Sequence, residues 1–553
     1  MPYIPSQNEI SAIKQNVKDV YVKVELLTEN MTIIDSLTGN LVSDSFSSDS
    51  NSIQRRSYTC NLVVSDHARK VNKSTILSEY LIGKDNKIWI DKYIRVYYGI
   101  FSYRAKEIIW WRIGTFTYVS ANYTFGATEC NLSLTCADKM CNYDGTKNGL
   151  IHQTKYDDIT GESAAGFKIP AVAQYETDSS GNVLKDSNGN RIVKSYNKIR
   201  DSVIALLNLA GITDYEVETY PAGRDIIPYD LEFSGEVVYT TVWNALRDLY
   251  PSWEYFFDID GRFIWRKIPT GKNESVAIND EIIDDIYVTE STSSSFAGIY
   301  NCTEVWGKTF TLTNEDRYAN TSTYTASSNT YTITIPLIKK TSVTTSNTSP
   351  LSYFCQGDKI AFRVFNTNTA ASPKLVIKGT DGTTISALPI VDSAGDALGA
   401  RVLPTSSTGK ICVFTYRQNI KANLNVQGVY LNGQTQAYGY YEEKNPDCPF
   451  STVNIKKNVK RIIKETLFSD DLCYNQAEYE TYKTCAMKDT INLTMVIVPW
   501  LEVNQKVSFT SKLTGVTEQY MISNISWSTL DGTMTMSMYK FLEDFEYVKN
   551  QGS

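Results

Sequence analysis

Residues 491–509 read INLTMVIVPWLEVNQKVSF, and after a polar loop residues 518–541 read EQYMISNISWSTLDGTMTMSMYKF. Apolar and polar residues alternate through both stretches, which predicts antiparallel strands with one buried face. Met534, Met536 and Met538 share one face of the last strand, and such a stripe is more typical of a core than of a ligand site. The end of the chain is therefore predicted to be antiparallel β structure.

The composition of the whole chain extends this prediction. The 553 residues are enough for about three to five domains. The 54 Lys and Arg against 61 Asp and Glu give a net charge of −7, which argues against a protein that coats DNA or RNA, and no sequence-specific nucleic-acid partner is expected. Two histidines leave little room for histidine-rich metal sites, whereas 37 tyrosines among many Thr, Ser and Asn fit strands with one core face and one wet interface. We expect a large, β-rich protein that is not an enzyme.

Cysteine spacing and the N-terminus indicate where the chain is made. No C-x-x-C occurs among the ten cysteines, and Cys130 and Cys136 share parity with Leu132 and Leu134, so they are predicted as core positions of one strand. The N-terminus lacks the basic and apolar regions of a signal peptide. The longest apolar runs fall far short of the ~20 residues that span a bilayer. We interpret this as synthesis in a reducing cytoplasm, without a membrane-spanning segment.

The N-terminal half divides into three predicted parts. Residues 1–142 are dominated by alternating strands and are predicted to form a compact β-barrel. Residues 143–196 contain few large apolar side chains and are predicted to be an exposed loop or hairpin. Their DSNGN turn resembles the start of an EF-hand loop, but Arg191 stands where that loop requires glycine, so a plain Asn-Gly turn is the better interpretation. Residues 197–295 are predicted as an α/β domain, with two helices followed by the hairpin WEYFFDIDGRFIWRKIP.

The composition changes again near residue 310. Residues 310–445 are rich in Thr, Ser, Asn and Gly, with short strands separated by regular turn signals, which predicts an inserted β-sandwich. Residues 446–484 are predicted to be helical, first through VNIKKNVKRIIKETLF with its basic face and then through YNQAEYETYKTCAM.

Known catalytic motifs do not occur in the sequence. There is no GxGxxG, Walker motif, HExxH or GxSxG, and His67 and His152 both read as ordinary exposed histidines. Paired carboxylates could in principle serve glycoside hydrolysis, but adjacent acids on a loop point in different directions. The candidate pairs are Asp157/Asp158, Asp284/Asp285, Glu442/Glu443 and Asp470/Asp471. We therefore predict no catalytic, cofactor-binding or metal-binding residues.

The order of parts resembles that of phage tail hub (baseplate hub) proteins. In that family a P-x-L-x-x-G-D turn precedes the closing strands, and Pro499 and Leu501 match it, whereas Asn504-Gln505 replaces Gly-Asp. The closing meander is matched by Tyr520, Ile522, Ile525, Trp527, Gly532 and Met534. The middle-domain pattern is matched by Ala210, Gly211, Ile212, Phe256, Phe257, Asp258, Gly261, Phe263 and Trp265. Arg55-Arg56-Ser57 before an alternating strand resembles the N-terminal barrel of these proteins.

This resemblance implies a mainly β fold with an α/β middle domain, two hub-type β-barrels and an inserted β-sandwich. The second barrel would be built from residues 296–309 and 485–545. It also implies a homotrimer that caps a six-fold tail tube and presents three-fold symmetry to a spike or tip. The implied partners are a distal tail or tube protein ring, a tail spike or tip protein and a tape-measure protein. The implied location is the virion tail tip, and part of the DNA conduit would be formed there.

Two alternatives stay open from the sequence. The first is a tail-tip adhesin whose 310–445 insertion binds host surface glycan, with Tyr430, Tyr438, Tyr440 and Tyr441 as candidates for an aromatic platform. These tyrosines would otherwise pack within the sandwich or its hinge. The second is a cell-wall hydrolase, which the missing motifs argue against.

Overall fold

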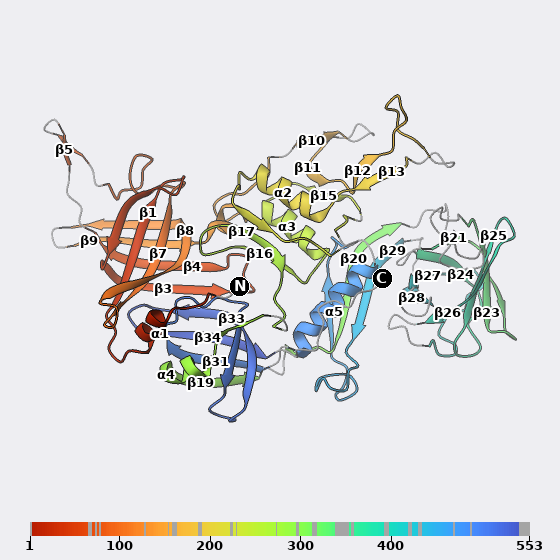
Figure 1. Ribbon diagram of the computed structural model, residues 1–553. Coiled ribbons are helices and arrows are strands. Elements are labelled where there is room, and N and C mark those ends of the chain that lie inside the picture. The colour runs from red at the N-terminus through yellow and green to blue at the C-terminus, as the bar shows by residue number, and fades with distance from the viewer. Residues whose placement is uncertain are drawn as a thin grey trace. The chain divides into compact units, whose positions relative to one another are not determined.

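The computed structural model is mainly β and separates into two compact units (Figure 1). The first unit takes Met1–Arg247, Ser252–Phe296 and Ala486–Phe545, and the second is built around Ala297–Cys485. The structure describes residues 3–64, 69–71, 74–76, 79–126, 129–152, 154–157, 163–185, 191–221, 225–227, 229–271, 274–294, 298–311, 318–337, 353–354, 359–391, 397–417, 423–429, 434–467, 470–486 and 489–540.

A 13-stranded sheet organises the first unit and contains strands from both ends of the chain. Along its main path the strands are β19 (Tyr287–Ser294), β31 (Asp489–Val496), β34 (Thr533–Lys540), β33 (Thr517–Trp527), β3 (Leu41–Asp49), β4 (Arg56–Val63), β9 (Cys130–Ala137), β8 (Glu107–Phe125), β7 (Tyr93–Ser102), β1 (Val20–Leu27) and β2 (Ile33–Thr38). β32 (Lys506–Thr510) pairs with β33, and β18 (Val276–Ile278) pairs with β32.

The N-terminal and C-terminal halves of this sheet join where β3 pairs with β33. Phe46 lies opposite Trp527, with the two rings 4.0 Å apart between centroids. The backbone N–H of Thr529 donates to buried Asp44 over 2.7 Å. Figure 1 shows the blue C-terminal strands continuing the red and orange N-terminal ones. The two predicted β regions are therefore parts of one continuous sheet.

Alternation places the core of this sheet as the sequence predicts. Met534, Met536 and Met538 are buried in the same apolar cluster as Leu134 and Cys136, so the methionine stripe is core. A short helix precedes the first strand of each half, α1 (Gln7–Lys14) before β1 and α4 (Asp280–Ile286) before β19. Lys14 of α1 forms an ion pair of 2.7 Å with Asp285 of α4.

The expectation that residues 296–309 join the closing strands is wrong. The strand that pairs with β31 is β19, which lies inside the range predicted for the α/β domain, and β20 (Cys302–Thr311) belongs to a different sheet. β19 reads YVTESTSS, without the apolar alternation of a half-buried strand, because it is the last strand on its side of the path. Its sequence therefore carries little strand signal.

The middle part of the first unit has the predicted helices and hairpin. The helices are α2 (Ile199–Leu209) and α3 (Tyr239–Asp248), and the sheet order is β14 (Tyr215–Val217), β17 (Phe263–Lys267), β16 (Trp253–Phe257). The hairpin turns through Asp258, whose carboxylate accepts the N–H groups of Asp260 and Arg262.

Smaller pairs surround these parts, and they include the hairpin predicted within residues 143–196. β12 (Val172–Tyr175) pairs with β13 (Val193–Tyr196), whereas residues 186–190 of the expected Asn-Gly turn lie outside the described residues. The remaining elements are β5 (Arg69–Val71) with β6 (Ser74–Ile76), β10 (Thr154–Asp157) with β11 (Ser163–Ile169) and β15 (Leu231–Ser234), and the 3-10 turn η1 (Lys139–Asn142).

The second unit contains a three-stranded sheet covered by one helix. The strand order is β29 (Gln434–Glu442), β20, β30 (Val459–Ile463), and α5 (Asp470–Ala486) packs its Cys473 and Ala477 against Val305 and Ala437. The prediction of a helix through VNIKKNVKRIIKETLF is wrong, because β30 pairs in parallel with β20 there. Strand pairing overrides the helix propensity of its Lys and Arg residues. The later predicted helix is present as α5.

The chain between β20 and β29 forms an eight-stranded sheet. Its order is β21 (Tyr318–Ala319), β24 (Lys359–Val364), β27 (Lys410–Arg417), β28 (Asn423–Val429), β26 (Thr384–Val391), β25 (Lys374–Gly379), β23 (Thr330–Ile335) and β22 (Thr323–Thr325). Ile333 and Ile377 from one half of this path share a core with Phe362 and Phe414 from the other half. The segment is thus an all-β insertion with its own core, inserted between two strands that pair with each other.

Candidate functional site

Buried charges hold together the three parts of the first unit. Arg55 immediately precedes β4, Glu254 lies in β16, and Asn504 lies in the turn before β32. Arg55 Nη2 and Glu254 Oε2 form an ion pair of 2.5 Å, with 3% and 7% of the two residues exposed. Arg266 and Arg56 complete the set, and these five residues are called the charged junction below.

Glu254 receives donors on both carboxylate oxygens. Arg266 Nε donates to Oε1 over 2.9 Å, and Asn504 Nδ2 donates to Oε2 over 2.7 Å. Burial alone would raise the pKa of Glu254, but Arg55 and Arg266 outweigh it and lower the pKa. The guanidinium of Arg55 also lies 3.6 Å from the ring centroid of Phe256. Glu254 is thus an ionised, fully bonded buried acid.

Arg56 connects the same three parts by different contacts. Its Nη1 donates to the carbonyl of Phe257 over 2.6 Å, and its Nη2 forms a 3.0 Å ion pair with Glu502. Its backbone N–H donates to Asp138, which also accepts the N–H of Met140 at the start of η1. Burial raises the pKa of Asp138 to about 6, against the lowering effect of these hydrogen bonds.

Asn504 accounts for one departure from the hub-like turn pattern. Its φ is +61°, a left-handed conformation that glycine adopts freely and that Asn tolerates better than most other residues. Asn504 therefore keeps the backbone conformation of the missing glycine and adds the hydrogen bond to Glu254. Gln505, in place of the acid, accepts the N–H of Glu502 through its side-chain oxygen over 3.0 Å. The substituted pair thus keeps a tight turn.

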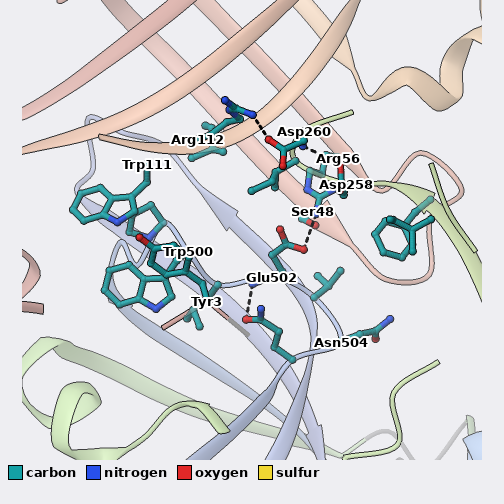
Figure 2. A pocket seen from close by; sticks show the side chains of 18 of the residues that line it. Tyr3, Ser48, Arg56, Trp111, Arg112, Asp258, Asp260, Trp500, Glu502 and Asn504 are labelled. Atoms are coloured by element: carbon teal, nitrogen blue, oxygen red, sulfur yellow. Dashed lines mark hydrogen bonds and ion pairs between the residues drawn. The ribbon is translucent and has the colours of Figure 1, made fainter. Parts of the chain in front are cut away.

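A cavity of about 790 Å³ opens beside the charged junction. Figure 2 shows Trp111, Trp500 and Tyr3 along one side, and Arg112 directed at Asp260 on the other. Trp111 Nε1 donates to Glu9 over 2.8 Å, and its ring lies 6.0 Å from that of Trp500. No histidine or cysteine is among the described residues that line the cavity. Its walls combine aromatic rings with charged side chains, of which Arg112 pairs with Asp260 and Arg56 with Glu502, whereas the buried Oε2 of Glu274 has no hydrogen-bond partner within the described residues. Such a largely aromatic and paired lining suits packing between parts better than proton transfer.

None of the candidate catalytic acids is among the described residues that line this cavity. Asp284 and Asp285 pair with Lys512 and Lys14, and Glu442 pairs with Lys457. Glu443 is 2% exposed and accepts the N–H of Asn445. His152 is exposed. His67, Asp158 and the side chains of Asp157, Asp470 and Asp471 lie outside the described residues.

The described part of the chain contains neither a metal-site cluster nor a membrane-spanning helix. Within it, no group of three His, Cys, Asp or Glu side chains has the arrangement of a metal site. Its helices are all too short or too polar to cross a bilayer.

The tyrosines considered for a glycan platform lie on β29, in the three-stranded sheet. Tyr438 is 7% exposed and its ring lies 4.5 Å from that of Trp306. Tyr441 packs edge-on against Tyr474 of α5, and Tyr440 donates to Glu442 over 3.3 Å. Tyr430 lies outside the described residues. Tyr438 and Tyr441 therefore pack at the hinge of the insertion, which is the arrangement expected if they do not form a glycan-binding platform.

The charged junction itself was not predicted from the sequence. In the sequence, Arg55-Arg56 stands out only by its position before a predicted strand, and Glu254 interrupts the otherwise aromatic WEYFF. An acid inside an apolar strand is the signal that could have been used, because a buried acid requires a partner.

Comparison with protein-family models gives a match over the C-terminal part of the chain. Residues 447–545 match a family model described as a domain of unknown function (DUF5048). No curated protein sequence matches the chain.

Several solved structures resemble the fold. One is the 43 kDa tail protein of prophage MuSo2 from Shewanella oneidensis, with 8% identity and a TM-score of 0.43, covering 94% of this chain and 98% of that one. Another is a tail protein from Neisseria meningitidis MC58, with 6% identity and a TM-score of 0.44, covering 96% and 99%. A third is prophage tail protein gp18 from Listeria monocytogenes EGD-e, with 10% identity and a TM-score of 0.36, covering 97% and 95%.

Proposed function

We propose that the chain is a structural, non-enzymatic protein of a phage tail: a trimeric hub that closes the distal end of the tail tube. The observation that carries this proposal is the continuous sheet of the first unit, in which two halves join through β3 and β33. Each half starts with a short helix, α1 or α4, and the two helices are linked by Lys14 and Asp285. One chain thus carries two β regions of related layout.

Such a layout suits a mismatch of symmetry. Three copies with two β regions each present six similar surfaces on one side, which fit a six-fold tube ring, while the assembly remains three-fold for a spike or tip. Head-to-tail contacts between copies close a ring when the rotation between them closes. The charged junction supports this role because it fixes both β regions to the middle part through bonded, buried charges.

The proposed partners follow from this position. They are two further copies of the chain, a distal tail or tube protein ring, a spike or tip protein, and a tape-measure protein that ends at the hub. The location is the virion tail tip, and the ring encloses part of the path of the genome. The paired state of Glu442, Asp284 and Asp285 favours structural roles for these acids over hydrolysis.

The test is the mass of the purified chain in solution. We expect about 187 kDa by native mass spectrometry and light scattering, three times the 62.3 kDa of one chain. A mass that stays at one chain across concentrations and salt conditions contradicts the proposal. Electron microscopy of tails labelled through this chain should place the label at the distal end only.

A further inference from the structure

One face of the continuous sheet is covered with short, uncharged polar side chains. Strand register places six hydroxyl residues side by side across both halves of the sheet. In order along the row these are Thr289, Thr494, Thr535, Ser526, Ser47 and Ser57. A second row crosses four N-terminal strands through Ser45, Thr59, Thr135 and Ser120. The two rows are called the hydroxyl face.

The hydroxyl face is accessible. The side chains of both rows are exposed or half-buried, whereas on the central strands their neighbours, such as Met534, Met536, Tyr58 and Cys60, are core residues. No Lys, Arg, Asp or Glu occupies either row, although 21% of the chain is charged. The nearest acid by register is Asp49 at the end of β3, which accepts the N–H of Asn51.

Polar groups of this face bond to one another across strands. Ser47 and Ser57 share a hydrogen bond of 2.8 Å between their hydroxyls. In adjacent rows Asn61 donates to Ser43 over 2.7 Å, and Ser537 donates to Asn492 over 2.6 Å. Groups already paired within the sheet have less to gain from a passing ligand. The face is therefore polar and wettable without being a strong binding surface.

Apart from Asp49, the charged residues considered on this side of the sheet lie on β8 or beyond it. There the outward residues of β1 and β7 include Lys23, Glu25 and Arg95, which pair with one another. Arg112 and Thr115 of β8 contact the β16–β17 turn through Asp260 and Ile259. Lys23, Glu25, Arg95 and Arg112 are thus paired, and the two hydroxyl rows themselves carry no charge.

We propose that the hydroxyl face is the wall past which duplex DNA moves, and that it works by neutrality rather than by repulsion. Protein affinity for the DNA backbone comes from Lys and Arg that displace counterions, with a salt slope of about −0.9 for each neutralised phosphate. A wall without cations holds no phosphate, and a wall without carboxylates sets no barrier against it. This inference rests on the proposed hub function and names the surface that the DNA meets.

The dimensions are suitable for this role. Eight strands, β19 through β8, at about 4.8 Å spacing make a face roughly 35 Å wide. Three such faces contain about 24 strands, more than the 16–18 strands that enclose a water-filled channel in porins.

The test adds positive charge to the face and compares it with the same charge elsewhere. Thr59→Lys with Thr535→Lys places one cation in each half of the hydroxyl face, at exposed positions. Thr325→Lys with Thr384→Lys adds equal charge at exposed positions of the insertion, and Thr59→Gln with Thr535→Gln adds length without charge. Each full-length variant is titrated with a fluorescent DNA duplex at several salt concentrations, and tail particles assembled with it are assayed for genome ejection.

For the face lysine variant we expect a slower ejection rate, and duplex binding whose salt slope steepens by about 0.9 for each new phosphate contact. The insertion lysine and face glutamine variants should eject like the wild type. Steep, salt-dependent duplex binding by the wild type would overturn the inference, and so would equal ejection by the two lysine variants. A trimer with unchanged ejection in the face lysine variant removes this inference alone, whereas a wild-type monomer removes the hub proposal.

Discussion

The charged junction of the first unit is buried, and so is the contact between α5 and its three-stranded sheet in the second unit. The two regions tolerate opposite changes. In the charged junction, Arg55 and Glu254 depend on atoms that are present, because each buried charge needs its partner. Where α5 packs against its sheet, close contact depends on glycines that have no Cβ atom. A Cβ on Gly439 would overlap the backbone of Cys473 and Tyr474, and one on Gly307 would overlap the carbonyl of Leu467. We therefore expect the charged junction to lose stability when an interacting group is removed, and the contact of α5 to lose stability when a methyl group is added.

The largest effect is expected from Glu254→Gln. Neutralising this acid leaves Arg55 charged and buried without its counter-ion, which costs about 3–5 kcal/mol of folding free energy. Urea unfolding followed by tryptophan fluorescence measures the loss. Asp214→Asn is the matched control, because Asp214 forms a 2.8 Å pair with Arg262 at the surface, where solvent screens the charges, and its loss should change the stability far less than Glu254→Gln. Similar losses in the two variants would show that burial does not set the strength of the pair.

Gly439→Ala should follow, at about 3 kcal/mol, because α5 must move away from β29 to admit one methyl group. Gly298→Ala serves as the control in the same unit, since a Cβ there meets no atom within 4 Å. Thermal unfolding of both variants by circular dichroism gives the difference. If Gly439→Ala is as stable as the control, close backbone contact is not what holds α5 in place.

Asp138 should make the charged junction sensitive to pH. Its pKa is about 6 in the folded protein and near 3.9 in an unfolded chain, so between these values the folded state keeps a proton that the unfolded state has lost. Stability from this group is therefore highest at low pH and decreases by roughly 2–3 kcal/mol as pH rises from about 4 to about 6. Asp138→Asn should remove that component. The measurement is the difference between wild-type and variant unfolding free energies across the pH range, and a flat difference refutes it.

The smallest effect separates the two roles of Asn504. Asn504→Gly keeps the left-handed backbone and loses only the hydrogen bond to Glu254, at about 1 kcal/mol. Asn504→Ala loses the bond and also strains the backbone, at about 2 kcal/mol. Urea unfolding of the two variants side by side is sufficient. An alanine variant as stable as the glycine variant would mean that the positive φ costs nothing here.

Local patterns explain which parts of this fold could be predicted. The methionine stripe of β34, the α2 helix and the WEYFF hairpin each carry their periodicity within a few residues. β19 and β30 could not be recognised in this way, because their strand state is set by pairing with β31 and β20 rather than by their own side chains.

The charged junction is the feature that is hardest to predict from the sequence. Arg55 and Glu254 are 199 residues apart, and Glu254 and Asn504 are 250 apart. No local pattern relates such positions, although a lone acid in an aromatic strand indicates that some partner exists. Asn504 shows a similar limit for sequence motifs. It replaces the glycine of the hub-like turn pattern, yet it keeps the left-handed backbone conformation that glycine would adopt.

The pairing of β3 with β33 has a consequence for synthesis. Asp44 and its partner Thr529 are 485 residues apart, so at about 5–20 residues per second the ribosome needs roughly 25–100 s to deliver the strand that completes the edge of β3. During that time β3 presents unpaired backbone groups, the state in which strands of different nascent chains associate. Its outward Ser43, Ser45 and Ser47 make that waiting edge polar, which lowers the hazard of aggregation while the chain is incomplete.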